Sequence, residues 1–175
     1  MFRPLTAPGR LLVPAASLVA LLLAGCGGGE ALEAKAVISG TAGSTLKGTA
    51  TFTEVDGGTR VVVEVEGAPP GDHAVHLHQT GDCSAADFSS AGGHFNPDGH
   101  AHGKPGEGEH HPGDFGNMTV AADGTGKLEL VADELTVAAG KYSVVGKSII
   151  VHDKPDDFGQ PTGNAGGRIG CGVVE

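Results

Sequence analysis

Short apolar or alternating runs, separated by glycine-rich turns, follow one another along most of the chain. The runs after residue 35 are rich in valine, isoleucine and threonine, and they predict β-strands of a few residues each. An Asp-Gly-Gly tripeptide at residues 56–58 lies between two of the runs and is typical of a hairpin turn. No run after residue 35 has a helical period. The predicted strands cover residues 36–38, 48–55, 60–66, 74–78, 117–121, 127–131 and 147–152.

Many short strands at regular spacing predict an all-β fold, an antiparallel Greek-key β-sandwich or flattened barrel. Two segments interrupt the pattern, at residues 81–116 and 153–170, and both are rich in glycine, proline, aspartate and histidine. Long loops inside a compact domain are usually functional or disordered. Because these two hold most of the histidines, we expect them to be functional.

The first 25 residues have the composition of a targeting signal. Arg3 and Arg10 precede an apolar run at residues 11–23, which is too short and too weakly flanked for a spanning helix. The run ends in Leu-Ala-Gly-Cys, which resembles the bacterial lipobox, where cleavage precedes the cysteine and Cys26 carries the lipid. We therefore expect a lipoprotein signal peptide over 1–25, a lipidated Cys26 with a flexible tether over 26–34, and one domain over 35–175. The alternative is an ordinary signal peptide cleaved near residues 24–25.

Export would place the domain outside the cytoplasm, lipid-anchored to the bacterial cell membrane or envelope. Thiols pair in an oxidising compartment unless they have another task. If Cys26 is acylated, Cys83 and Cys171 remain, and we expect a disulfide between them in preference to two free buried thiols.

The chain is acidic, with a formal net charge of −10. Arg3 and Arg10 are the only charged residues before Glu30, so removal of the signal would make the domain more negative still. This charge argues against a nucleic-acid partner and against electrostatic attraction to anionic lipid. The lipid anchor is therefore the only membrane attachment that we expect.

Nine histidines in such a chain suggest metal binding, and their spacing strengthens the suggestion. His76 and His78 are two apart on a predicted strand, so both side chains leave the same face, while Val75 and Leu77 face the apolar layer. One such pair is weak support, but the loops and the last predicted strand add further donors. Imidazole suits copper and zinc, and a carboxylate completes a tetrahedral zinc site. These further donors are His94, His102, His111, Asp114 and His152.

Several motifs, taken in order, resemble the copper–zinc superoxide dismutase family, in its bacterial secreted lipoprotein form. The similarity covers residues 36–174, and independent motifs in register make it specific. They are His76-Leu77-His78, Gly93-His94-Phe95-Asn96-Pro97, His102-Gly103, residues 111–117 (HPGDFGN), residues 149–152 (IIVH) with Asp156-Asp157, and residues 163–172 (GNAGGRIGCG).

The resemblance implies a role for each matching residue. The copper ligands would be His76, His78, His94 and His152. The zinc ligands would be His94, His102, His111 and Asp114, so that His94 bridges the two metals. Asp156 would link a copper ligand to a zinc ligand, Cys83 and Cys171 would form the family's disulfide, and Arg168 would attract and orient superoxide.

The activity implied is conversion of superoxide to dioxygen and hydrogen peroxide by alternating Cu(II)/Cu(I) redox, which would protect the cell envelope. The stretch from His152 to Arg168 is shorter than the electrostatic loop of the animal cytosolic enzymes and carries little charge beyond Lys154, Asp156 and Asp157. Steering of the anion would therefore depend on a local positive patch. The sequence leaves open whether the protein is a monomer or a homodimer.

Three histidines have no ligand role in this interpretation. His73 matches a structural histidine that we expect to form hydrogen bonds, whereas His100 and His110 could rival His102 or His111 for zinc. A lipoprotein that buffers or delivers metal would share the ligands but would need neither Arg168 nor Asp156. An anchored interaction module on the same fold could lose ligands freely, yet every ligand position is filled.

Overall fold

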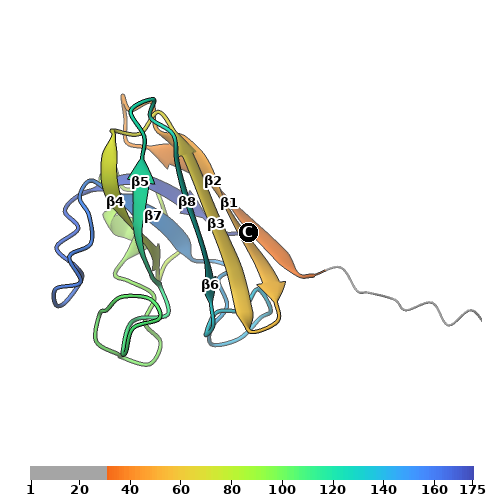
Figure 1. Ribbon diagram of the computed structural model, residues 1–175. Helices are drawn as coiled ribbons and strands as arrows, with labels where there is room; N and C mark the ends of the chain where they lie inside the picture. The colour runs from red at the N-terminus through yellow and green to blue at the C-terminus, as the bar shows by residue number, and fades with distance from the viewer. Residues whose placement is uncertain (1–30) are drawn as a thin grey trace, which may run out of the picture.

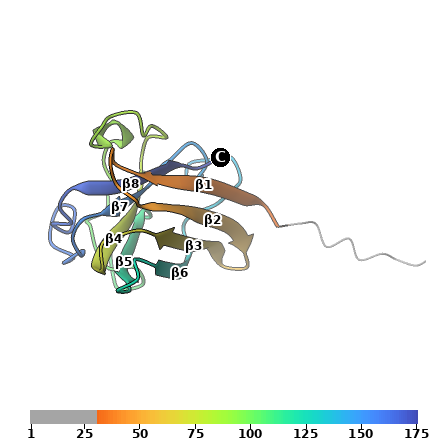
Figure 2. The same cartoon turned by 90° about the horizontal axis from the view of Figure 1, so that it is seen from above.

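The computed structural model describes residues 31–175, which form a closed antiparallel barrel of eight strands in the order β1-β2-β3-β6-β5-β4-β7-β8 (Figures 1 and 2). This confirms the predicted all-β fold. The expected signal peptide and lipidated cysteine lie outside the described residues. The strands are β1 (Glu33–Gly40), β2 (Lys47–Val55), β3 (Gly58–Glu66), β4 (Gly71–His78), β5 (Asp114–Val120), β6 (Gly126–Ala132), β7 (Ser148–His152) and β8 (Arg168–Val173).

Strict alternation of inward and outward side chains explains the N-terminal half of the barrel. In β3, Val61, Val63 and Val65 are buried, while Arg60 and the glutamates face outward. A period of two places one face of each strand in the core. The apolar interior is a single cluster to which most of the strands contribute, and its largest fully buried side chain is Phe52.

Strands β4 and β7 differ because they are buried on both faces. The burial of β4 is continuous from His73 to His78, and all five residues of β7 are buried. Val75 and Leu77 lie in the core cluster, as predicted, so His76 and His78 point to the outer face. Both long loops lie on this side of the barrel (Figures 1 and 2). They cover the outer face and create a buried polar layer there.

Strand β8 was not predicted, and it closes the barrel. It pairs with β7 along its length and with β1 at Ser39↔Cys171 and Gly40↔Gly170. Its sequence is poor in strand formers because a Cβ at Gly170 or Gly172 would press against β1 or its neighbours. Glycine is therefore required by close backbone approach, which weakens the sequence signal for a strand. The second long loop accordingly ends before Arg168, and the first ends before Asp114.

Helical structure in the described part of the chain is confined to one 3-10 turn at Ser89–Ala91. Among residues 31–175, no helix has the length and apolar character needed to cross a membrane.

The disulfide between Cys83 and Cys171 is present, and it joins the first long loop to β8. Its partners are 88 residues apart, so the bond closes a large loop of the unfolded chain. We expect its reduction to lower the free energy of unfolding by about 4 kcal/mol, because the unfolded chain regains that loop entropy. Urea denaturation with and without reductant measures the change. A Cys83→Ser/Cys171→Ser control should already be destabilised and should not respond to reductant, whereas an unchanged wild-type midpoint would contradict the prediction.

Candidate metal centre

The two histidines of β4 are each held through one ring nitrogen. His76 donates from Nε2 to Asp156 Oδ2 at 2.8 Å, and His78 donates from Nδ1 to the Gly92 carbonyl at 2.9 Å. The other nitrogens, His76 Nδ1 and His78 Nε2, are buried without a hydrogen-bond partner. Since these contacts place the proton on the paired nitrogen, the remaining lone pairs are free to bind a metal.

Four buried histidines each place one ring nitrogen within 4.8 Å of those of the others: His76, His78, His94 and His152. They come from β4, from the first long loop and from the end of β7. An isolated antiparallel bridge between His78 and His94 brings that loop against β4. His152 leaves both ring nitrogens unpaired. An unsatisfied buried polar group costs about 1–3 kcal/mol, so this arrangement fits a bound metal ion and would be unfavourable as a bare polar core.

A second group joins the first long loop to the start of β5 and consists of His94, His102, His111 and Asp114. Asp114 Oδ1 lies 2.9 Å from His94 Nδ1 and 3.1 Å from His111 Nδ1, and those two nitrogens are 3.3 Å apart. Tetrahedral zinc with bonds near 2.0–2.1 Å separates its ligand atoms by about 3.3 Å. The donor types and their spacing therefore suit zinc.

The contact between His102 and Asp114 also suits a shared zinc ion. His102 Nδ1 is 2.9 Å from Asp114 Oδ2, yet this nitrogen has no partner with hydrogen-bond geometry. Two atoms that are close but not aligned for a hydrogen bond are typical of ligands that face a common ion. All four donors of the second group are buried, so the set is closed to solvent.

His94 is the residue common to both groups. Its Nδ1 faces Asp114 and His111, which leaves Nε2 for the first group. The His94 ring also lies 4.0 Å from that of His76, measured between centroids. One imidazole can therefore contribute one nitrogen to each group.

Asp156 connects the two groups a second time. Its Oδ2 accepts from His76 Nε2, and its Oδ1 accepts from His102 Nε2 at 3.0 Å. The carboxylate is buried, and a Cβ on Gly163 would overlap it, so this loop position needs glycine. Carboxylates placed in this way fix the tautomer and the orientation of metal-binding histidines.

Burial controls the charge of these groups. Desolvation lowers the pKa of His78 to about 2, that of His152 to about 3 and that of His94 to about 4. For Asp114 and Asp156, desolvation raises the pKa, but hydrogen bonds from the neighbouring histidines outweigh it and hold both values below their usual range. At neutral pH the imidazoles of His78, His94 and His152 are therefore neutral while the carboxylates of Asp114 and Asp156 are ionised, which is the form that binds metals.

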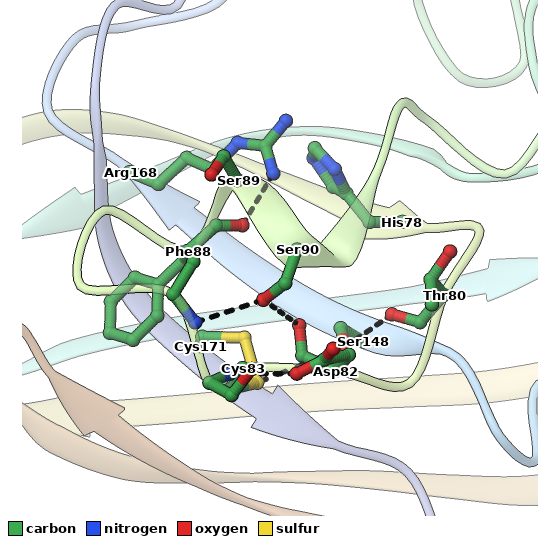
Figure 3. The surroundings of a disulfide bond; sticks show 12 residues. His78, Thr80, Asp82, Cys83, Phe88, Ser89, Ser90, Ser148, Arg168 and Cys171 are labelled. Atoms are coloured by element: carbon green, nitrogen blue, oxygen red, sulfur yellow. Dashed lines mark hydrogen bonds between the residues drawn. A yellow bond between two sulfur atoms is a disulfide. The ribbon is translucent and has the colours of Figure 1, made fainter.

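Arg168 lies at the start of β8, beside the first group. Its guanidinium donates from Nη1 to the Phe88 carbonyl of the disulfide loop at 2.6 Å (Figure 3). Nη2 donates to the Gly92 carbonyl of the same loop, also at 2.6 Å. Phe88 is buried beside Cys171 and adopts a left-handed conformation with φ of 58°. The disulfide and Phe88 thus hold the carbonyls that orient the arginine.

A cleft of about 480 Å³ opens over this region. Three histidines of the first group line it, and its other charged side chains are Lys154 and Arg168. Within residues 31–175, no carboxylate lines the cleft, although the chain carries ten more formal negative than positive charges. The lining suits a small anion.

Comparison with known families agrees with this geometry. The model of the family described as copper/zinc superoxide dismutase matches residues 46–174. The chain belongs to the copper/zinc superoxide dismutase family. The barrel of this superoxide dismutase family member also resembles the crystal structure of the clock protein EA4, with 37% identity, 81% of this chain and 92% of that chain covered, and a TM-score of 0.73.

A second solved relative is a double mutant of a SOD-like protein from Bacillus subtilis. It is 32% identical, with 79% of this chain and 94% of that chain covered, and its TM-score is 0.72. The resemblance drawn from the sequence motifs is therefore confirmed at the level of family and fold. Members with names as different as these share the barrel, so activity must be argued from the site itself.

The remaining histidines of this dismutase-family chain lie outside both groups. Both nitrogens of His73 contact backbone oxygens, of His152 at 2.7 Å and of Pro69 at 2.8 Å, as expected for a structural residue. His100 and His110 are both half-buried, and His100 contacts the carbonyl of His110. Neither joins a metal-binding group among the described residues, so the structure favours His102 and His111 over them.

Sequence reasoning missed Asn117 on β5. Its side-chain amide donates to the Asp156 carbonyl at 2.9 Å and accepts from the Asp156 amide at 2.6 Å. This two-way contact fixes the backbone that carries the linking carboxylate. The Gly-Asn pair at 116–117 was part of a recognised motif, but only the fold shows what the amide contacts.

The lowered histidine pKa values predict acid sensitivity of the metal-free protein. Unfolding returns each histidine to a pKa near 6.5. The contribution of each lowered pKa to the free energy of unfolding is therefore fully present above pH 6.5, and it is lost as pH falls towards the folded values of about 4 and below. We expect the free energy of unfolding to fall by up to about 1.4 kcal/mol per pH unit for each histidine that stays neutral.

Urea denaturation of the metal-free protein between pH 8 and pH 4.5 measures this slope. His152→Gln should reduce the slope, while His110→Gln, at a half-buried loop position outside both histidine groups, should leave it unchanged. A flat profile below pH 6.5 would show that these imidazoles are not kept neutral by the fold.

Proposed function

We propose that this protein is a copper- and zinc-dependent superoxide dismutase that acts outside the cytoplasm. The observation that carries the proposal is the shared imidazole of His94 beneath a cleft that Arg168 lines and to which the described part of the chain contributes no carboxylate. The first histidine group would hold copper, and the second would hold zinc. Copper supplies one-electron redox chemistry when bound, whereas zinc has none.

The donor sets favour this assignment. Four imidazoles without thiolate or thioether suit copper, and three imidazoles with one carboxylate suit zinc. A closed zinc set leaves no open position for an attacking water, which argues against hydrolytic chemistry at that ion.

The protein's own residues have two tasks in the reaction. Arg168 binds and orients the anion, because its planar guanidinium stays charged and its position is fixed by the Phe88 and Gly92 carbonyls. His94 holds a proton at Nε2 when that nitrogen is free, and it can give that proton to the reduced product. Its position is kept through Nδ1 by the second group.

Lys154 and Arg168 form the local positive patch that an acidic chain needs for an anionic substrate. A cleft lined by one sign of charge focuses the field and raises the association rate. Surface carboxylates elsewhere would oppose this attraction at long range, so the effect depends on ionic strength.

Substitution of Arg168 tests the proposed activity. In the full chain purified in detergent and loaded with copper and zinc, Arg168→Ala should lower the second-order rate of dismutation by about tenfold at low salt, because the focused cation is lost. The rate of Arg168→Lys should lie between those of wild type and Arg168→Ala, since lysine keeps the charge but not the paired donors. Pulse radiolysis or a stopped-flow superoxide assay measures the rates.

Two outcomes would contradict the proposal. Equal rates for wild type and Arg168→Glu at low salt would exclude the proposed steering. Binding of both metals with no activity above that of free copper would favour a metal-handling lipoprotein instead.

The same proposal includes the lipid anchor, which rests on the Leu-Ala-Gly-Cys motif that ends at Cys26. In a bacterial host, Cys26→Ser should abolish incorporation of labelled palmitate and move the protein from the membrane to the soluble extracytoplasmic fraction, because no lipid can be attached. Cys83→Ser serves as the control that should keep the label. Unchanged labelling of Cys26→Ser would show that the lipid is attached at another residue, and an unlabelled wild type would show that there is no lipid anchor.

A further inference from the structure

Asp153 lies directly after His152 and faces Gly167, the residue before Arg168. The Asp153 amide donates to the Gly167 carbonyl at 3.0 Å, and the Gly167 amide donates to Asp153 Oδ1 at 2.6 Å. Two hydrogen bonds, one donated by each residue, thus join Asp153 to Gly167. Asp153 follows the candidate copper ligand His152, and Gly167 precedes the candidate anion-binding Arg168.

The carboxylate stands where the strand ladder is irregular. The register between β7 and β8 shifts between Val151 and His152, after which His152 pairs with Arg168. At this point the Gly167 amide bonds to the Asp153 side chain instead of a strand carbonyl. A Cβ on Gly166, whose φ is +76°, would overlap the same carboxylate oxygen. The Asp153 carboxylate is therefore packed tightly against the backbone, which leaves little room for a longer side chain at position 153.

Arg168 is therefore fixed at both ends of a long side chain. Its guanidinium is held by the disulfide loop, through Phe88 and Gly92, while its backbone is held beside Asp153. An arginine side chain has large rotamer freedom, so the placement of its head group depends on where its Cα is fixed. A shift of the 166–167 backbone would move the guanidinium relative to the histidines.

We propose that Asp153 is a positioning residue that sets Arg168 for anion binding. The inference rests on the proposed function, in which Arg168 contacts the anion. Asp153 acts through its carboxylate oxygen as a hydrogen-bond acceptor and not through its charge.

Simple electrostatics makes the opposite prediction. Asp153 is exposed and adjoins cleft residues Lys154 and Gly166. Removal of a negative charge there would strengthen anion binding if charge alone mattered. The positioning role predicts weaker binding, so the sign of the change distinguishes the two.

Azide, a small anion that ligates Cu(II), serves as the probe. Its dissociation constant is measured by absorbance titration of the full chain loaded with copper and zinc. Asp153→Ala should weaken azide binding by about fivefold, the factor that corresponds to one lost hydrogen bond of about 1 kcal/mol. Asp153→Asn keeps an acceptor oxygen without the charge and should stay within about twofold of wild type.

Asp153→Glu keeps the charge but displaces the acceptor, and it should weaken azide binding as alanine does. The Asp153→Ala/Arg168→Ala double variant should bind azide no more weakly than Arg168→Ala alone, because Asp153 acts through Arg168. Amide hydrogen exchange of the metal-free protein gives a readout that needs no metal: exchange at Gly167 should be faster in Asp153→Ala and Asp153→Glu than in Asp153→Asn.

The outcomes separate this inference from the proposed function. If Arg168→Ala weakens azide binding while Asp153→Ala and Asp153→Glu match or exceed wild type, Arg168 keeps its role and the positioning inference is wrong. If Arg168→Ala binds azide as wild type does, the anion-binding role of Arg168 fails. If Asp153→Ala weakens binding equally with and without Arg168, Asp153 acts by another route and the inference is overturned.

Discussion

Burial of several imidazoles beneath two long loops determines how the candidate metal centre is built. The barrel places His76 and His78 on the outer face of β4, and the two long loops then cover that face. Burial makes the protonated ring costly, so His78, His94 and His152 stay neutral. Such a layer is unfavourable as protein alone because several ring nitrogens have no partner. A pair of metal ions would satisfy them.

The loops that complete this layer are long, and each is held by a few specific contacts. The disulfide joins the first loop to β8, and Asn117 holds the backbone of Asp156 in the second. Asp156 in turn contacts His76 from the barrel and His102 from the first loop. The strands therefore supply His76, His78 and His152 from a fixed frame, while the loops supply the other histidines and cover the site.

Much of this could be predicted from the sequence because the pattern was local. Short apolar or alternating runs identified seven of the strands. Because side chains alternate along a strand, the two-residue separation of His76 and His78 placed both on one face of β4, with Val75 and Leu77 on the other. Family motifs assigned the residues that the structure brings together in two groups.

The rest depends on contacts between distant segments, which leave no local pattern. Strand β8 is rich in glycine because it packs closely against β1, so it lacked the usual strand composition. The carbonyls that hold Arg168 and the amide of Asn117 act through backbone contacts that residue type does not reveal. The choice of His102 and His111 over their neighbours His100 and His110 likewise required the folded loop.

The central claim is that one imidazole, that of His94, serves two metal ions. Its most direct test is the metal content and dismutase activity of His94→Ala, with His110→Ala as the matched loop control, in the full chain loaded with copper and zinc. We expect His110→Ala to bind both metals and turn over superoxide as wild type does. His94→Ala should bind both metals more weakly and lose most of the activity. Wild-type affinity for both metals together with wild-type activity in His94→Ala would contradict the central claim.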